Sequence, residues 1–446
     1  MRVFPALAGL TAALLGAPLA AQAPVTYEHY TLDNGLSVFL VPNRTVPIVT
    51  VNVWFDVGSR LERNGRSGFA HLFEHMMFQG SANVKKGEHF QLIERAGGDM
   101  NGTTSEDRTN YFETLPSNRL NLGLWLEADR MRSLAITDTN FENQRETVKE
   151  ERRLRVDNQP YAGAFLEGLT VPYDSTACFG YSHSVIGSMA DLNAATTADV
   201  QAFFDLHYAP NNATLTVTGD FEPSEAKALI QQYFGDIPKG AEPPGFECNI
   251  QYNSGARRVT WEDALANLPA SFVAYRVPEH RNEDEPALSL LSTILGGGES
   301  SRLNRALVRD QQVAVQSAAV ELSRRGPGLF VAFAIANQGQ TADTLAAALH
   351  AVVARIAAEG VTAEELEKAK NSFRRDHVFS RQTSMGVAEA IQHYVHFHDS
   401  VDEINTDEKK YLAVTAADIQ RVVRRYLVPD NSVTLLVVPK GQGVTP

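Results

Sequence analysis

The chain has 446 residues, of which 43% are hydrophobic and 21% charged, and its formal net charge is -13. This length suffices for two or three domains with cores that need no metal or disulfide to be stable. The acidic balance excludes a general nucleic-acid binder, because such proteins present a basic surface to the phosphate backbone.

Residues 1–21 have the layout of a secretory signal peptide. Arg2 gives a positive start, an apolar stretch follows, and Ala20 and Ala21 offer a cleavage region. The apolar run is short for a transmembrane helix, and no later run reaches about 18 uncharged apolar residues. We therefore expect a secreted protein without a transmembrane span, and the bacterial periplasm is our first expectation for its location.

The first half of the chain mixes strand and helix patterns. Residues 36–41 and 48–55 are rich in β-branched residues and predict strands, and residues 101–114 predict a strand pair. Helices are predicted over residues 68–78, 90–95 and 120–134. Because strands and helices do not alternate strictly, we predict an α+β fold, in which each domain has a mostly antiparallel sheet with helices packed on one face.

Residues 71–75 read His-Leu-Phe-Glu-His. On a helix, His71 and His75 lie one turn apart on the same face, so their imidazoles can bind one metal ion. Glu74 leans toward that face and is the candidate catalytic base. A pair of core histidines beside a surface glutamate and a purely structural metal site are the alternatives.

A catalytic zinc ion needs a third protein ligand and an open position for water. A helix predicted to start near Thr139 carries Glu146, Glu150 and Glu151. Spacing alone does not choose among these three carboxylates, which could also be a solvated face paired with the neighbouring Arg and Lys side chains.

Residues 196–217 and 415–436 form an internal repeat. Each copy predicts a capped helix, a Pro/Asn turn and a β-branched strand. The recurring pairs include Thr196 and Thr415, Asp199 and Asp418, Pro210 and Pro429, and Asn212 and Asn431. We predict two homologous domains in tandem, at residues 25–238 and 256–441, joined by a turn-rich linker at residues 239–255.

The second copy has no His-x-x-Glu-His, so we expect it to lack a zinc site. It does contain a second histidine cluster, His393, His396 and His398, which we interpret as a structural cluster rather than a metal site. The two cysteines, Cys178 and Cys248, could pair in an oxidising compartment or remain separate thiols.

Several segments together resemble the pitrilysin/insulinase family of metallopeptidases, which carry the inverted zinc motif H-x-x-E-H. The segments are residues 68–80, Gly97-Gly98, residues 101–104, residues 145–151, residues 208–212 and Gly219-Asp220. The resemblance covers nearly the whole mature chain. It is nearest to the short branch with mitochondrial processing peptidase and its bacterial relatives, because the chain has two domains rather than four.

The resemblance implies a zinc-dependent endopeptidase with one Zn²⁺ per chain, in which Glu74 activates a zinc-bound water. The 25–238 domain would then be catalytic. Its third ligand would be Glu151, which stands six residues after Arg145 as in the family pattern, with Glu150 in reserve. Gln144 occupies the position of a supporting glutamate in the family.

The resemblance also implies how a peptide substrate binds. Asn101, Gly102, Thr103 and Thr104 match the strand beside which family substrates lie, and Arg309 matches a substrate-binding arginine. Gln316 stands where the family has a tyrosine. We therefore expect a dimer, either a homodimer or a heteromer with a zinc-less homologous subunit that supplies the Arg/Tyr pair. A non-catalytic scaffold subunit of the same fold is the alternative function.

Overall fold

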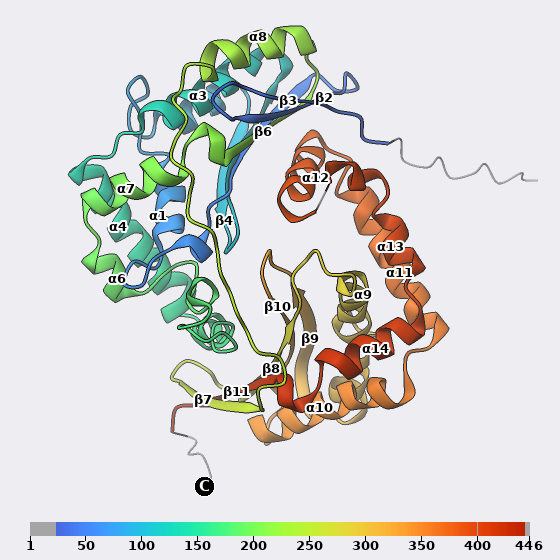
Figure 1. Ribbon diagram of the computed structural model, residues 1–446. Helices are drawn as coiled ribbons and strands as arrows, with labels where there is room; N and C mark the ends of the chain where they lie inside the picture. The colour runs from blue at the N-terminus through green and yellow to red at the C-terminus, as the bar shows by residue number, and fades with distance from the viewer. Residues whose placement is uncertain (1–23, 399, 442–446) are drawn as a thin grey trace, which may run out of the picture.

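The computed structural model describes residues 24–398 and 400–441, and the predicted signal peptide lies outside this part of the chain. Figure 1 shows two sheets with their helices, the first in the blue-to-green part of the chain and the second in the yellow-to-red part. The predicted α+β fold with two similar halves is confirmed.

The first sheet has six strands in the order β1-β2-β6-β3-β5-β4. Neighbouring strands are antiparallel except for β2 and β6. The strands are β1 (Glu28–Thr31), β2 (Ser37–Pro42), β3 (Ile48–Phe55), β4 (Asp99–Thr104), β5 (Thr109–Pro116) and β6 (Ala213–Gly219). Both predicted single strands and the predicted strand pair are present, and β4 lies at an edge of the sheet.

The second sheet has five strands in the order β7-β11-β8-β10-β9, and only β7 and β11 are parallel. The strands are β7 (Arg257–Asp263), β8 (Ala270–Val277), β9 (Ala314–Leu322), β10 (Gly328–Ala336) and β11 (Ser432–Pro439). The parallel pair is second and third in the order of the first sheet, where β1 adds an outer strand, and first and second in the order of the second sheet.

Most helices form the outer layers of the two halves, while α12 (Ser384–Phe397) lies on the inner side of the first sheet (Figure 1). The first half has α1 (Phe69–Met76), α2 (Glu88–Arg95), α3 (Leu120–Ser133), α4 (Asp138–Arg152), α5 (Ala162–Gly168), α6 (Met189–Ala194), α7 (Thr197–His207) and α8 (Pro223–Phe234). The second half has α9 (Glu285–Gly296), α10 (Ala342–Glu359), α11 (Ala363–Phe379), α12 (Ser384–Phe397), α13 (Glu408–Ala413) and α14 (Ala416–Tyr426). The helix expected near Thr139 begins at Asp138, because the side chain of Thr137 caps it by accepting a hydrogen bond from Asn140 N.

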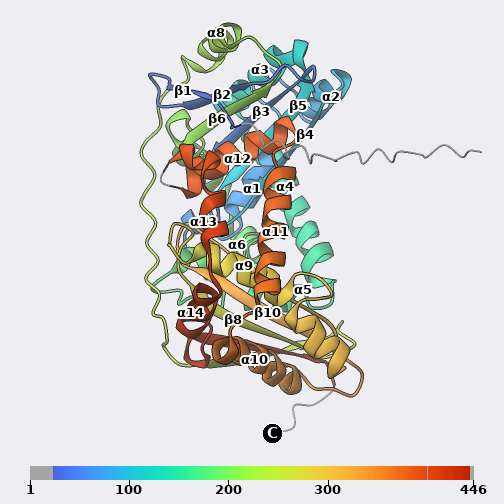
Figure 2. The same ribbon diagram turned by 90° about the vertical axis from the view of Figure 1, so that its right-hand side faces the viewer.

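Strand β3 is buried on both faces. Side chains alternate between the two faces of a strand, so Val49, Val51 and Val53 point into the core of the first half, and Asn52 and Trp54 point the other way. Helix α12, from the second half of the sequence, covers that opposite face, as Figures 1 and 2 show. Its Gln392 Nε2 donates hydrogen bonds to the carbonyl oxygens of residues 52 and 214, at 3.1 and 2.8 Å.

The second sheet receives a helix from the first half in return. Ala164 and Phe165 of α5 pack with Phe272 and Leu435 of the second sheet. The backbone N–H of Tyr161 donates to the Asp263 carboxylate at 2.7 Å. One helix from each half therefore covers the second face of the other half's sheet. The sequence predicts helices on only one face of each sheet.

The internal repeat has the same contacts in both copies. Thr196 and Asp199 form a capping box at the start of α7, as Thr415 and Asp418 do at the start of α14. In the turn that follows, Asn212 Nδ2 donates to a backbone carbonyl at 2.8 Å, and its counterpart in the second copy does so at 2.7 Å. The repeated residues are thus those that cap the helix and fix the turn into the next strand.

Between α8 and β7 the chain has no helix or strand over residues 238–256. Cys248, in this segment, forms a disulfide with Cys178 of the first half. The disulfide decides between the two alternatives that the sequence left open for the cysteines. The domain boundaries at residues 238 and 256 remain a prediction.

No single helix within residues 24–398 and 400–441 has the length and apolar character needed to cross a membrane. The consecutive helices α10 and α11 meet both criteria only when taken together, and they are bent by 109°.

Candidate metal centre and its surroundings

Helix α1, which carries the His-x-x-Glu-His motif, starts at a tightly constrained glycine. Gly68 has φ 90°, and a Cβ there would lie 2.8 Å from the carbonyl oxygen of Ile186, so both the backbone angle and the space require glycine. The buried Glu62 carboxylate accepts hydrogen bonds from the backbone N–H groups of Gly68 and Ala70, at 2.8 and 2.7 Å. The two oxygens of this side chain satisfy free N–H groups at the start of the helix, and burial raises the pKa of the Glu62 carboxyl group to about 8.

Helix α4 packs beside α1 and brings Glu151 to the two histidines. Glu151 Oε2 lies 3.1 Å from His75 Nε2 and 3.6 Å from His71 Nε2. These separations suit ligands of one tetrahedral zinc ion, which with bonds of roughly 2.0–2.1 Å places its ligand atoms about 3.3 Å apart. Glu146 and Glu150 instead form ion pairs with Lys149 and Arg153 of their own chain segment.

The protonation states of this cluster also suit a metal. Burial, and next the neighbouring His75, lower the pKa of His71 to about 4, so its imidazole is neutral near pH 7. A hydrogen bond with His75 lowers the pKa of Glu151, which is therefore a carboxylate. Neutral imidazole and ionised carboxylate are the forms that bind metal ions.

Glu74 lies on the same helix beside the cluster. Its carboxylate accepts a hydrogen bond of 2.6 Å from Thr104 Oγ1, at the end of β4. Burial raises the pKa of Glu74, while the bond from Thr104 acts in the opposite direction. The position predicted for the catalytic base is thus occupied by a largely buried carboxyl group that one hydroxyl holds in place.

Two arginines near the cluster were not singled out from the sequence. Arg155 pairs with the second oxygen of Glu151 at 3.1 Å. Arg108 stacks over the ring of Trp54 at 4.9 Å, and its charge lowers the pKa of Glu74. Arg108 lies in the turn of the predicted strand pair, but nothing local indicates that its charge would reach the metal helix.

The predicted substrate strand is the edge strand β4, so its outer side is free to pair with another strand. Thr103 and Thr104 point to different partners, since Thr103 Oγ1 donates to Asn110 Oδ1 at 2.6 Å and Thr104 holds Glu74. Asn101 Oδ1 accepts from the backbone N–H of Gly102 at 2.9 Å. The edge position is compatible with peptide binding, and the roles of these four residues remain predictions.

Two other predicted residues form their hydrogen bonds or ion pairs with other partners. Arg309 forms an ion pair with Glu299 at 2.8 Å, and no hydrogen bond or ion pair within the described ranges joins it to the three candidate ligands. Gln144 is buried two turns before Glu151 on α4 and donates to Asn143 Oδ1 at 2.8 Å. Their substrate-binding and supporting roles stay predictions.

Comparison with known proteins defines the family. Residues 37–166 match the model described as insulinase (peptidase family M16), and residues 194–373 match the model described as peptidase M16 inactive domain. The zinc protease PqqE of Helicobacter pylori is 30% identical over 97% of this chain and 98% of its own length. The chain belongs to the insulinase family, M16. The resemblance drawn from the sequence motifs is therefore confirmed.

Other M16 relatives agree in fold and extent. The crystal structure of a protease from Helicobacter pylori superposes with a TM-score of 0.88 at 29% identity, over 93% of this chain and all of that one. The probable mitochondrial-processing peptidase subunit beta of Arabidopsis thaliana is 24% identical over 89% of this chain and 75% of its own length. The segment matching the inactive M16 domain includes most of the second half, which lacks the histidine motif.

Glu62 provides a first test of how the metal helix is held. We expect Glu62→Gln to lower the free energy of unfolding by about 1–3 kcal/mol, because the amide leaves one buried N–H of α1 without an acceptor. Zinc affinity should fall as well, since His71 lies in the first turn of α1. Denaturant unfolding and zinc titration measure both effects. Glu94→Gln, at an exposed site on α2, is the control, and equal stability of the two variants would contradict the capping role.

Proposed function

We propose that this M16 protein is a zinc-dependent endopeptidase that hydrolyses peptides or extended polypeptide segments. The observation that carries the proposal is the convergence of His71, His75 and Glu151 from two helices, with the Glu74 carboxyl group beside them. The zinc protease relatives support it.

Two imidazole nitrogens and one carboxylate oxygen form a donor set that suits zinc and leaves a fourth position open. Zinc bound there supplies Lewis-acid activation of the attacking water and of the scissile carbonyl. The second oxygen of Glu151 stays paired with Arg155, which orients the carboxylate toward the histidines.

Glu74 performs the proton transfers. Its carboxylate accepts a proton from the attacking water and then delivers it to the leaving amine. Its burial strengthens the carboxylate as a base, because a raised pKa increases proton affinity. The Thr104 hydroxyl keeps the group oriented and, together with the charges of His75 and Arg108, limits this rise.

We further propose that substrates bind as an additional strand along β4. The free edge of this strand ends at Thr104, whose hydroxyl contacts Glu74, so a peptide paired with Asn101–Thr104 would run past the metal centre. Strand addition relies on backbone hydrogen bonds, and we therefore expect broad sequence specificity.

The proposed active form is a dimer, either with a second copy or with a zinc-less homologous subunit. The proposal of a dimer is based on Gln316, which stands where the family pattern has a substrate-binding tyrosine. In addition, Arg309 forms an ion pair with Glu299. A non-catalytic scaffold is the alternative function, and the intact set of three ligands and Glu74 disfavours it.

We propose that the protein is exported, with residues 1–21 removed, and that it works in the bacterial periplasm. The Cys178–Cys248 disulfide supports an oxidising location. Protein from the periplasmic fraction should then lack residues 1–21 and carry no free thiol. The double variant Cys178→Ala/Cys248→Ala should lose about 2–4 kcal/mol of unfolding free energy, because the disulfide closes a long loop. A cytoplasmic protein that retains residues 1–21 would contradict export.

The central test is Glu74→Gln. We expect the purified variant to retain zinc at His71, His75 and Glu151, and to lose hydrolysis of a quenched peptide library by about 10²–10⁴-fold, because the amide cannot accept a proton. Zinc content by mass spectrometry and initial rates measure both. Full activity in the variant would exclude Glu74 as the base. Zinc without hydrolysis in the wild-type chain would favour the partner-dependent form, and wild-type protein without zinc would favour the scaffold.

Thr104→Val tests the hydrogen bond to Glu74. Catalysis needs the carboxylate, so kcat/KM falls as the pH drops through the Glu74 pKa, which lies above the ordinary value. Without the Thr104 hydroxyl the charged form loses a hydrogen bond, and this acidic limb should move to higher pH. Thr31→Val, at an exposed site on β1, should leave the limb in place. An unmoved limb in Thr104→Val would show that this bond does not tune Glu74.

A further inference from the structure

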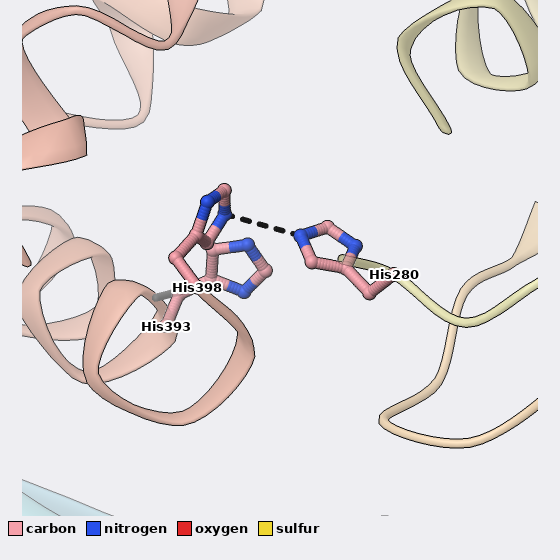
Figure 3. A group of neighbouring side chains, drawn as sticks. All are labelled: His280, His393 and His398. Carbon is pink, nitrogen blue, oxygen red and sulfur yellow. Dashed lines mark hydrogen bonds between the residues drawn. The ribbon is translucent and has the colours of Figure 1, made fainter. Parts of the chain in front are cut away.

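Three histidines from distant parts of the chain meet at one point outside the site described above (Figure 3). His280 follows strand β8, and His393 and His398 lie at the C-terminal end of α12. The ring centroids are 5.0 Å apart for His280 and His393, 4.9 Å for His280 and His398, and 5.3 Å for His393 and His398. One nitrogen of each ring lies within 4.8 Å of the other two.

The far nitrogens of two of these rings are already engaged. His398 Nδ1 lies 3.1 Å from the Glu403 carboxylate, which at neutral pH only accepts hydrogen bonds, so Nδ1 carries the proton. His280 Nδ1 lies 2.8 Å from Ser323 Oγ. This leaves the Nε2 atoms of His280 and His398 directed at each other, at 3.1 Å. Histidines that bind metals are commonly oriented in this way, by a carboxylate or hydroxyl on the other ring nitrogen.

We propose that His280, His393 and His398 form a second metal site, which binds Zn²⁺ or a similar imidazole-preferring divalent ion. The 3.1 Å between two Nε2 atoms is close to the about 3.3 Å between ligands of one tetrahedral zinc ion. It also equals the His75–Glu151 separation in the metal centre of the same chain. The third nitrogen, within 4.8 Å, needs to move by no more than about 1.5 Å to reach the same spacing.

Charges around the cluster allow a cation to bind. Burial lowers the pKa of His280 to about 4 and that of His393 well below its usual value, so both rings offer lone pairs near neutral pH. Arg281, Lys410 and Arg381 oppose a cation. The carboxylates of Glu403 and Asp407, which lie with His398 in one group, offset them, and Lys410 is already paired with both.

Solvent reaches the cluster from two sides. A cavity of about 450 Å³ is lined by His280, His398 and Glu403, and a second of about 750 Å³ is lined by His280 and His393. An ion can therefore enter, and a water molecule can fill the position that three histidines leave open.

The site would join two separate elements of the molecule. His280 lies in the turn after β8 of the second half, while α12, which carries His393 and leads to His398, covers the sheet of the first half. A metal bound to all three histidines would therefore tie α12 to the second half and hold the two halves together. This second site is independent of the proposed peptidase activity, because the two sites share no residue.

A single N–H···N hydrogen bond between neutral His280 and His398 is the competing arrangement, since 3.1 Å fits it as well. Metal stoichiometry separates the two. The experiment uses the full protein with His71→Ala and His75→Ala, which removes the first site, and titrates it with zinc chloride. We expect about one zinc per chain to remain after dialysis, against about two for the wild type.

Adding His280→Gln or His398→Gln to that double variant should remove the remaining zinc. Adding Glu403→Gln should weaken its binding by about 10- to 100-fold, as is typical when the group orienting a ligand is lost. His350→Gln, at another partly buried histidine of the second half, should retain full zinc. Circular dichroism and thermal unfolding verify that each variant is folded.

Two measurements on the folded His71→Ala/His75→Ala variant need no further substitution. X-ray absorption at the zinc edge should show three imidazole ligands, and zinc should raise the thermal midpoint. The proposal would be overturned if the double variant retained no zinc. It would also be overturned if adding His280→Gln left the zinc content as high as adding His350→Gln does. Either result would mean that His280 and His398 form only a hydrogen-bonded pair.

Discussion

The contact between helices α1 and α4 at His75 and Glu151 is the interaction on which the candidate metal centre depends. A helix can place two imidazoles one turn apart by itself, but it cannot supply the third ligand from the same face without crowding. The 3.1 Å approach of Glu151 therefore has to come from packing. Helix α1 begins after Gly68, and its first N–H groups donate hydrogen bonds to the buried Glu62. These contacts fix the position from which α1 packs against α4. Ligand geometry thus follows from the way the start of α1 is fixed in the core.

The two halves are coupled at the end of β4 that carries Thr104. The loop directly after Thr104 contains Asp107, which accepts hydrogen bonds from Tyr181 Oη at 2.7 Å and from the backbone N–H of Arg325 at 3.0 Å. Arg325 comes from the second half, and Thr104 holds Glu74. The second half therefore contacts the loop after the strand that orients the proposed base. This half has no copy of the histidine motif. This gives the motif-less half a physical role in the same site.

The exchange of helices joins the two halves through packed apolar surface. An exposed sheet face with residues such as Trp54 and Phe272 would leave apolar surface in water, and α12 and α5 cover these faces reciprocally. The proposed second metal site lies where this arrangement is completed, because α12 turns His393 and His398 toward His280 while His396 faces Trp54 on the first sheet. One short helix thus contributes to the core of the first half and to a polar cluster of the second.

The sequence by itself determined what depends on local spacing. The His-x-x-Glu-His periodicity placed two candidate ligands and a candidate base on one helix face, and the Thr/Asp capping boxes located the repeated helix starts. Spacing left three carboxylates open as third ligand, and only the family resemblance singled out Glu151. The tertiary structure alone decided the capping of α1 by Glu62, the exchange of helices, and the meeting of His280 with His398. These contacts join residues far apart in the chain, so they depend on how whole elements pack, and no local pattern of side chains encodes them.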